Sequence, residues 1–153
     1  MLDPLSLRTR DELAAFLVDK TDDDLDAMAN NLGIDKVLKT VFDGMALEYV
    51  PSEGPRERVI VEWSIFGPDR RMHIWQNDIS RDGFSATPSA TDQPDVALRV
   101  DLAPFLRLMG GTVRGIEALS AGTLKLKGNI ELAMEMEAWF GLVPAPPSRS
   151  AGS

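Results

Sequence analysis

The spacing of apolar residues divides the chain into a helical first third and a strand-rich middle. After two shorter helical segments, a third shows the i, i+3, i+4, i+7, i+8 order expected of one buried helix face. The residues in that order are Ile34, Val37, Leu38, Val41 and Phe42. Gly44 follows them, and because glycine is common just after a helix, we expect this helix to end there.

Two capping signals mark the helices that come before it. Thr9 and Glu12 have the spacing of a capping box, and Thr21 and Asp24 repeat it. In that motif each of the two side chains binds a backbone N–H of the other residue, which satisfies the start of a helix. We therefore expect one helix over residues 10–20 and a second that begins after Thr21 and ends at Gly33.

From residue 45 onward the apolar period changes to the alternation of strands. Val59, Val61, Trp63 and Ile65 share one face of the most regular strand. Trp75, on the next strand, is a candidate cross-strand partner for Trp63. The expected strands cover residues 46–50, 58–66, 70–76, 83–87 and 96–101, and the alternating stretch between Gly122 and Gly128.

The helix expected after Asn129 is apolar around far more of its circumference than one buried face requires. At 100° per residue its apolar side chains spread over about 220°, whereas a single stripe needs only about 100°. Met134 and Met136 lie in this arc, and unbranched thioether side chains adapt to ligands of varied shape. The excess indicates contact with a sheet, with other helices and with a cavity; the alternative is an ordinary tight core.

Glu137 lies inside the apolar arc of this last helix, whereas its acidic neighbours face outward. A carboxylate in such a place must form an ion pair, accept hydrogen bonds, or take up a proton through a raised pKa. Three interpretations follow: a salt bridge to an arginine at a cavity rim, a polar contact to a bound ligand, or a general acid. The salt bridge is the leading one.

Charge and composition exclude several functions. Net charge is −8, and no cluster of lysine and arginine of the kind that binds phosphate backbones stands out. We therefore expect no nucleic-acid binding and no strong membrane association. The chain has no cysteine, no apolar run long enough for a membrane span, and no signal-peptide pattern at its start. A cytoplasmic location is the expectation.

Other candidate chemistry is sparse. His73 is the only histidine, and with no cysteine beside it a zinc site is not expected. No serine or aspartate lies at a recognisable catalytic spacing from it, so we expect a structural role. Lys125 and Lys127 alternate with leucines and are expected to face solvent. We expect no metal, no cofactor and no catalytic residue.

The segment from residue 95 to 140 resembles the sterol carrier protein-2 family. The resemblance rests on strand 95–101, the Phe-Leu-x-Leu-Met pattern at 105–109, Gly-x-Leu-x-Leu-x-Gly-Asn at 122–129, and x-x-Leu-Ala-Met at 130–134. The chain departs from the family at Arg114-Gly115-Ile116, where members often carry Asn-Pro-Gln, at Leu119-Ser120, where aromatic residues are common, and at Glu137, where many hold glutamine.

The resemblance implies an α+β sandwich in which a curved, mostly antiparallel five-stranded sheet carries helices on one face and encloses a hydrophobic tunnel. It implies residues 1–33 as an N-terminal helical extension and residues 34–142 as the lipid-binding domain. Residues 143–153 are rich in proline, serine and small residues, and this composition predicts a disordered tail. The expected ligand-binding residues are Phe105, Leu106, Met109, Ile116, Leu119, Leu124, Leu126, Met134, Met136, Glu137, Trp139 and Phe140.

The leading functional hypothesis is a non-catalytic carrier that holds a fatty acid, acyl-CoA, sterol or related lipid in the tunnel. The first alternative is a small enzyme or biosynthetic accessory protein that acts on a hydrophobic substrate there, with Glu137 and His73 as acid/base candidates. The second is a protein-interaction module whose N-terminal helices, residues 10–43, bind a protein partner.

Overall fold

The computed structural model of the chain describes residue 7 and residues 9–140. Its centre is a five-stranded sheet in the order β3-β2-β1-β4-β5. The strands are β1 (Val59–Phe66), β2 (Met72–Ser80), β3 (Gly83–Thr87), β4 (Val96–Asp101) and β5 (Leu124–Gly128). β1 and β4 pair in parallel and the other neighbours are antiparallel. The mostly antiparallel α+β fold expected from the sequence is confirmed.

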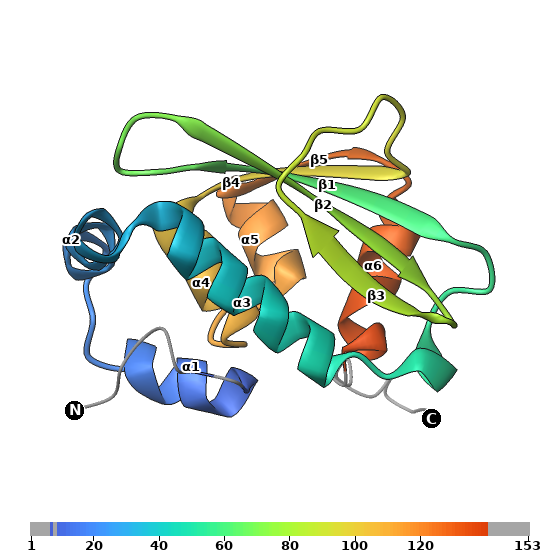
Figure 1. The fold of residues 1–153 in the computed structure, drawn as a ribbon, viewed down its shortest axis with the longest axis horizontal. Helices are drawn as coiled ribbons and strands as arrows, with labels where there is room; N and C mark the ends of the chain where they lie inside the picture. The colour runs from blue at the N-terminus through green and yellow to red at the C-terminus, as the bar shows by residue number, and fades with distance from the viewer. Residues whose placement is uncertain (1–6, 8, 141–153) are drawn as a thin grey trace.

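The helices of the described residues lie on one face of this sheet (Figure 1). They are α1 (Arg10–Leu17), α2 (Asp22–Leu32), α3 (Ile34–Glu48), α4 (Leu102–Met109), α5 (Gly115–Ala121) and α6 (Ile130–Trp139), with a short 3₁₀ helix, η2 (Pro51–Glu53), after α3. α1 lies on the side of α3 and α4 away from the sheet and contacts both. The sheet, then α3 and α4, and then α1 thus form successive layers in space.

The expected capping signals are confirmed. The Thr9 hydroxyl accepts from the Glu12 amide while the Glu12 carboxylate accepts from the Thr9 amide, each at 3.1 Å. Thr21 and Asp24 form the same reciprocal pair at the start of α2. Gly33 ends α2 with a φ of 97°. This conformation is sterically unfavourable for any residue that has a Cβ.

The alternation of β1 separates a buried face from a solvent face. Val59, Val61, Trp63 and Ile65 are buried against the helices, and Trp63 pairs with Trp75 of β2 as expected.

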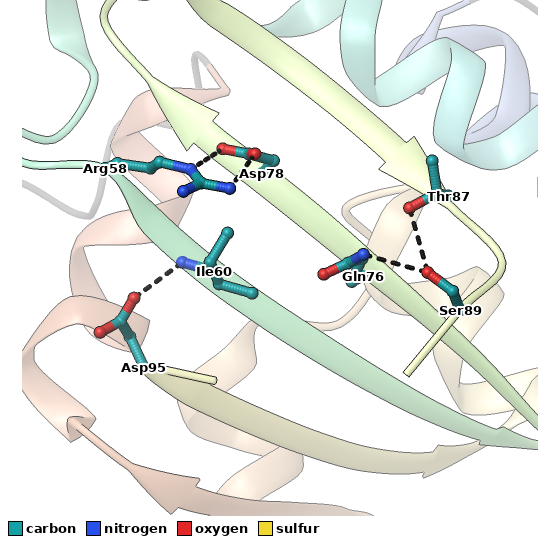
Figure 2. Close-up of polar contacts among 7 residues, drawn as sticks. All are labelled: Arg58, Ile60, Gln76, Asp78, Thr87, Ser89 and Asp95. Carbon is teal, nitrogen blue, oxygen red and sulfur yellow. Dashed lines mark hydrogen bonds and ion pairs between the residues drawn. The ribbon is translucent and has the colours of Figure 1, made fainter. Parts of the chain in front are cut away.

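The opposite face carries polar contacts (Figure 2). Arg58 donates two hydrogen bonds to Asp78, at 2.8 and 2.6 Å, and the Ile60 amide donates to Asp95 at 2.8 Å. The strand alternation thus sets one face toward the helices and one toward solvent.

Several boundaries differ from the sequence prediction. Helix α1 ends at Leu17 instead of residue 20, and β2 covers Met72–Ser80 instead of residues 70–76. Helix α3 continues through Gly44 to Glu48, so the strand expected at 46–50 is wrong. A glycine inside a helix costs only about 1 kcal/mol relative to alanine, and tertiary contacts of the last turn exceed that cost. Met45 packs on the core, Glu48 binds the Arg10 amide, and Tyr49 is buried next to the helix end.

Aromatic rings fill the space between the sheet and the helices. Phe42 lies 4.8 Å from the Trp75 ring and 5.5 Å from Phe105, and Phe105 lies 5.2 Å from Trp63. Trp63 also donates its indole N–H to the Oδ1 of Asn77 at 2.8 Å. These contacts fix the inner wall of the sheet, on which the site is built. The tail expected at 143–153 lies outside the described residues.

Candidate ligand cavity

An apolar cavity of about 160 Å³ lies between the sheet and the helices. The sheet contributes Trp63, Leu98, Leu124 and Leu126, and every helix from α1 to α6 contributes side chains. A cavity of about 150 Å³ lined by aliphatic and aromatic residues stays dry and binds a molecule such as benzene. The space suits an apolar small molecule, and a longer one requires it to widen.

Most of the residues expected to bind ligand come together around this cavity. Ten of the twelve line it: Leu106, Met109, Ile116, Leu119, Leu124, Leu126, Met134, Met136, Glu137 and Phe140. Phe105 and Trp139 do not line it. Both are almost fully buried in the core, where Phe105 packs against Phe42 and Trp63. These two positions support the wall of the cavity rather than its surface.

Two apolar residues of the lining, one on α5 and one on α6, are also exposed to solvent. Ile116 on α5 is 53% exposed and Met134 on α6 is 49% exposed, and both also line the cavity. Apolar side chains that face both the interior and the solvent form a rim. An apolar ligand that enters here meets no charged barrier from these two residues.

Glu137 is held by an ion pair with Arg114. The Nε of Arg114 donates to Oε2 at 3.1 Å and its Nη2 donates to Oε1 at 2.9 Å. The Gly115 amide also donates to Oε2, at 3.3 Å. The hydrogen bonds from Arg114 lower the pKa of Glu137 below its usual value, although partial burial acts in the opposite direction.

This geometry favours one of the interpretations of Glu137. The lowered pKa favours the ionised carboxylate over a carboxyl group kept protonated as a general acid. The salt bridge at the cavity rim is the interpretation that the structure supports. Arg114 is the first residue of the tripeptide that departs from the family pattern, so the two departures meet in one contact.

Sequence reasoning missed the contribution of the N-terminal helices. From α1, Leu13, Phe16 and Leu17 line the cavity, and Met28 of α2 joins them. Val37, Val41 and Met45 of α3 also take part. The apolar stripes of these helices were visible in the sequence. A stripe shows only that a face is covered and does not identify what covers it.

A second ion pair lies where α1 meets α3 and α6. The backbone amide of Arg10 donates to Glu48 Oε1 at 2.9 Å. The side-chain Nη2 of Arg10 lies 3.8 Å from Glu48 Oε2. The same Nη2 donates to the carbonyl of Phe140. Arg10 and Glu48 both line the cavity. This pair therefore fastens α1 in place and puts charge at the cavity wall.

His73 lies away from the cavity. Its Nε2 is 2.9 Å from Asp69 Oδ2, and its Nδ1 is 3.5 Å from Asp35 Oδ1. The ring thus connects the β1–β2 turn to the start of α3, which is a structural role. In residue 7 and residues 9–140, no three His, Cys, Asp or Glu side chains are arranged to hold a metal ion.

The comparisons with known proteins concern mainly the sheet and the last three helices. Residues 59–141 match the model of the SCP-2 sterol transfer family. Sterol carrier protein 2 like 2 from Aedes aegypti superposes with a TM-score of 0.54 at 20% identity, over 69% of this chain and 98% of that one. The palmitated form of that protein gives 0.52 at 19% identity, over 66% of this chain and 87% of that one.

A further similar structure is the inverting sec-alkylsulfatase Pisa1 from Pseudomonas sp.. Its TM-score is 0.56 at 16% identity over 71% of this chain, but this chain spans only 16% of the length of that enzyme. At such identities the likeness establishes the fold. A comparison with curated proteins gave no match. Among the helices in the described part of the chain, none has the length and apolar character to cross a membrane.

Proposed function

The chain belongs to the SCP-2 sterol transfer family, and from this membership we propose that it binds a lipid non-covalently in the cavity between sheet and helices. The observation that carries the proposal is the mainly apolar lining, to which the sheet and helices α1 to α6 contribute. A carrier needs such a lining because removal of apolar ligand surface from water supplies about 25 cal/mol per Å². The cytoplasmic location expected from the sequence stays a prediction.

The composition of the lining supports a ligand larger than the space of about 160 Å³. Of the six methionines in the part of the chain that the structure describes, five line the cavity. They are Met28, Met45, Met109, Met134 and Met136. Because an unbranched side chain can take many rotamers, such a wall can move aside at small cost and close again when the ligand leaves. A long acyl chain or a ring system is therefore compatible with the site.

The insect relative supports the same class of ligand. Its solution structure is that of the palmitated protein, and the fold matches this chain over 66% of the length. We extend lipid binding to this chain on the strength of family membership and the apolar lining together. The identity of the lipid is addressed separately below.

The test is to identify what the protein binds. Native mass spectrometry of the purified protein, followed by extraction of the bound molecule, is expected to reveal one lipid per chain. Addition of fatty alcohols, fatty acids or sterols to the emptied protein should raise its melting temperature, because a ligand that binds only the folded state stabilises it. A protein that arrives empty and whose melting temperature no member of the panel changes would refute the proposal.

No observation favours the two alternatives. Glu137 is ion-paired, and His73 lies outside the lining, so the two acid/base candidates do not meet around a substrate. The N-terminal helices direct side chains such as Phe16 and Val41 into the cavity instead of presenting them all to a protein partner. A carrier is the function that we retain.

A further inference from the structure

Three charged residues line the cavity: Arg10 at the start of α1, Glu48 at the end of α3 and Glu137 in the last turn of α6. Arg10 is the only lysine or arginine among the described lining residues. Arg10 and Glu48 both precede the segment that matches the family model, which begins at residue 59. The Arg10–Glu48 pair is therefore a feature of the N-terminal part of this chain.

Glu48 is held beside Arg10 by more than mutual attraction. Its Oε1 accepts from the backbone N–H of Arg10 at 2.9 Å, while its Oε2 lies 3.8 Å from Nη2. The two side chains are largely buried, with 18% and 29% of their surfaces exposed. Because the α1 backbone anchors one oxygen, the Glu48 carboxylate does not leave when another anion approaches the guanidinium.

This arrangement is unfavourable for a ligand carboxylate. Such a group next to Arg10 would be attracted by the guanidinium and repelled by Glu48, and the two effects nearly cancel because the two charges are so close together. The cost of removing the carboxylate from water would then remain without compensation. Glu137, which also lines the cavity, is already paired with Arg114 and offers a ligand carboxylate no positive charge.

An uncharged oxygen of a ligand does not incur the desolvation cost of a carboxylate. A guanidinium has five N–H donors, and the hydrogen bond that the Arg10 side chain donates within the described chain comes from Nη2 alone. The remaining donors can serve a hydroxyl, ester or ketone oxygen without any change in the charge of the site. A neutral polar group loses far less on leaving water than a carboxylate does.

We propose that the Arg10–Glu48 pair makes this cavity select lipids with an uncharged oxygen function, such as alcohols, esters or ketones, over fatty acids and acyl-CoA. The proposal rests on the proposed lipid-binding function and names the ligand class of the same site. It assigns the selection to two residues outside the segment that the family model matches.

The test compares ligands of one chain length at pH 8: dodecan-1-ol, methyl dodecanoate and dodecanoate, each titrated into the full-length protein. The wild type is expected to bind the alcohol and the ester at least about tenfold more tightly than the acid, a difference of about 1.4 kcal/mol. Glu48→Gln keeps an oxygen for the Arg10 amide and removes the negative charge. It should strengthen dodecanoate binding about tenfold and leave the alcohol nearly unchanged.

Glu135→Gln is the matched control, since this exposed residue of α6 does not line the cavity and its loss changes the net charge equally. Dodecanoate binding by the wild type as tight as that of the alcohol would overturn the selectivity and leave lipid binding intact. An equal effect of Glu135→Gln would also overturn it, because net charge would then be the cause. If none of the three ligands bound, the proposed function itself would fail, and the selectivity with it.

Discussion

At the scale of single residues, ion pairs determine which charges the cavity presents. Glu137 lies in the apolar arc of α6, yet Arg114 and the Gly115 amide occupy both of its oxygens. Arg10 and Glu48 neutralise each other at the start of α1. Each charged residue of the wall is thus paired with an opposite charge, and the chemistry of the wall is that of an apolar site with a few hydrogen-bond donors.

The lowered pKa of Glu137 predicts a pH-dependent contribution to stability. Since the pKa is lower in the folded than in the unfolded chain, the contribution is complete above the unfolded value of about 4.3 and is lost as the pH falls through the folded value. Glu137→Gln should reduce the free energy of unfolding by about 1 kcal/mol at pH 7. Urea titrations should show this difference becoming smaller as the pH falls below the unfolded value.

The control for this prediction is Glu135→Gln, because Glu135 lies on the same helix, α6, and its side chain is exposed. It should leave stability unchanged at both pH values. A loss caused by Glu137→Gln that stays constant from pH 7 to pH 3 would show that the ion pair with Arg114 is not its origin.

The Trp63–Asn77 hydrogen bond predicts a second residue-level effect. Asn77 is fully buried and accepts the indole N–H of Trp63, which lines the cavity. Asn77→Ala leaves that donor without a partner and should lower the free energy of unfolding by about 1–3 kcal/mol. Chemical denaturation measures the loss. Asn30→Ala, at an exposed site on α2, should change stability by less than about 0.5 kcal/mol, and an equal loss there would contradict the assignment.

At the scale of elements, α1 completes the cavity on the side away from the sheet. It is a short helix, and helices of this length depend on packing rather than on intrinsic propensity. Its apolar side chains cover the cavity, and Arg10 fastens its first turn to α3 and α6. Helix α1 therefore contributes both apolar surface and a charged pair to the cavity wall.

This role of α1 predicts a difference between two residues on the same helix turn. Phe16 lines the cavity, whereas the neighbouring Val18 is 82% exposed. Phe16→Ala should weaken lipid binding about tenfold through the lost apolar contact, equivalent to about 1.4 kcal/mol. Val18→Ala should leave affinity unchanged in the same titration. Equal affinities for the two variants would mean that α1 does not contact the ligand.

At the scale of the whole molecule, the cavity exists because the helices of one layer do not close completely on the sheet. Phe42 and Phe105 fill the space under Trp63 and Trp75, while the methionines and leucines beside them leave about 160 Å³ open. The packed aromatic residues stabilise the fold, and the open space beside them is where a ligand can bind. Reducing the open volume should therefore affect binding more than folding.

Met136→Trp tests this separation. Met136 is 8% exposed and lines the cavity, so the larger ring should occupy part of the space and weaken lipid binding at least about tenfold. Because overpacking costs about 1–3 kcal/mol, circular dichroism and thermal unfolding must show that the variant is folded. Met72→Trp, on β2 and outside the lining, is the control. Unchanged affinity of folded Met136→Trp would remove Met136 from the site.

Gly44 is a position at which the local sequence did not predict the observed secondary structure. The glycine and the apolar residues that follow it indicate a helix end and a short strand, yet α3 continues for another turn. Met45 and Glu48 are held there by α1 and the core, which are contributed by distant parts of the chain. By contrast, Gly33 ends α2 as expected, because a positive φ at that point is a local requirement.

The sequence alone determined the elements and faces whose causes are local: the capping boxes at Thr9 and Thr21, the alternation around Trp63, and the apolar excess of α6 that indicated a cavity. Only the tertiary structure decided that Arg114 takes Glu137 and that α1 covers the cavity with Arg10 beside Glu48. The physical reason is separation along the chain. A cap or a strand period depends on neighbours a few residues away, whereas these pairs join residues 23 and 38 positions apart, which meet only when the sheet and helices have packed.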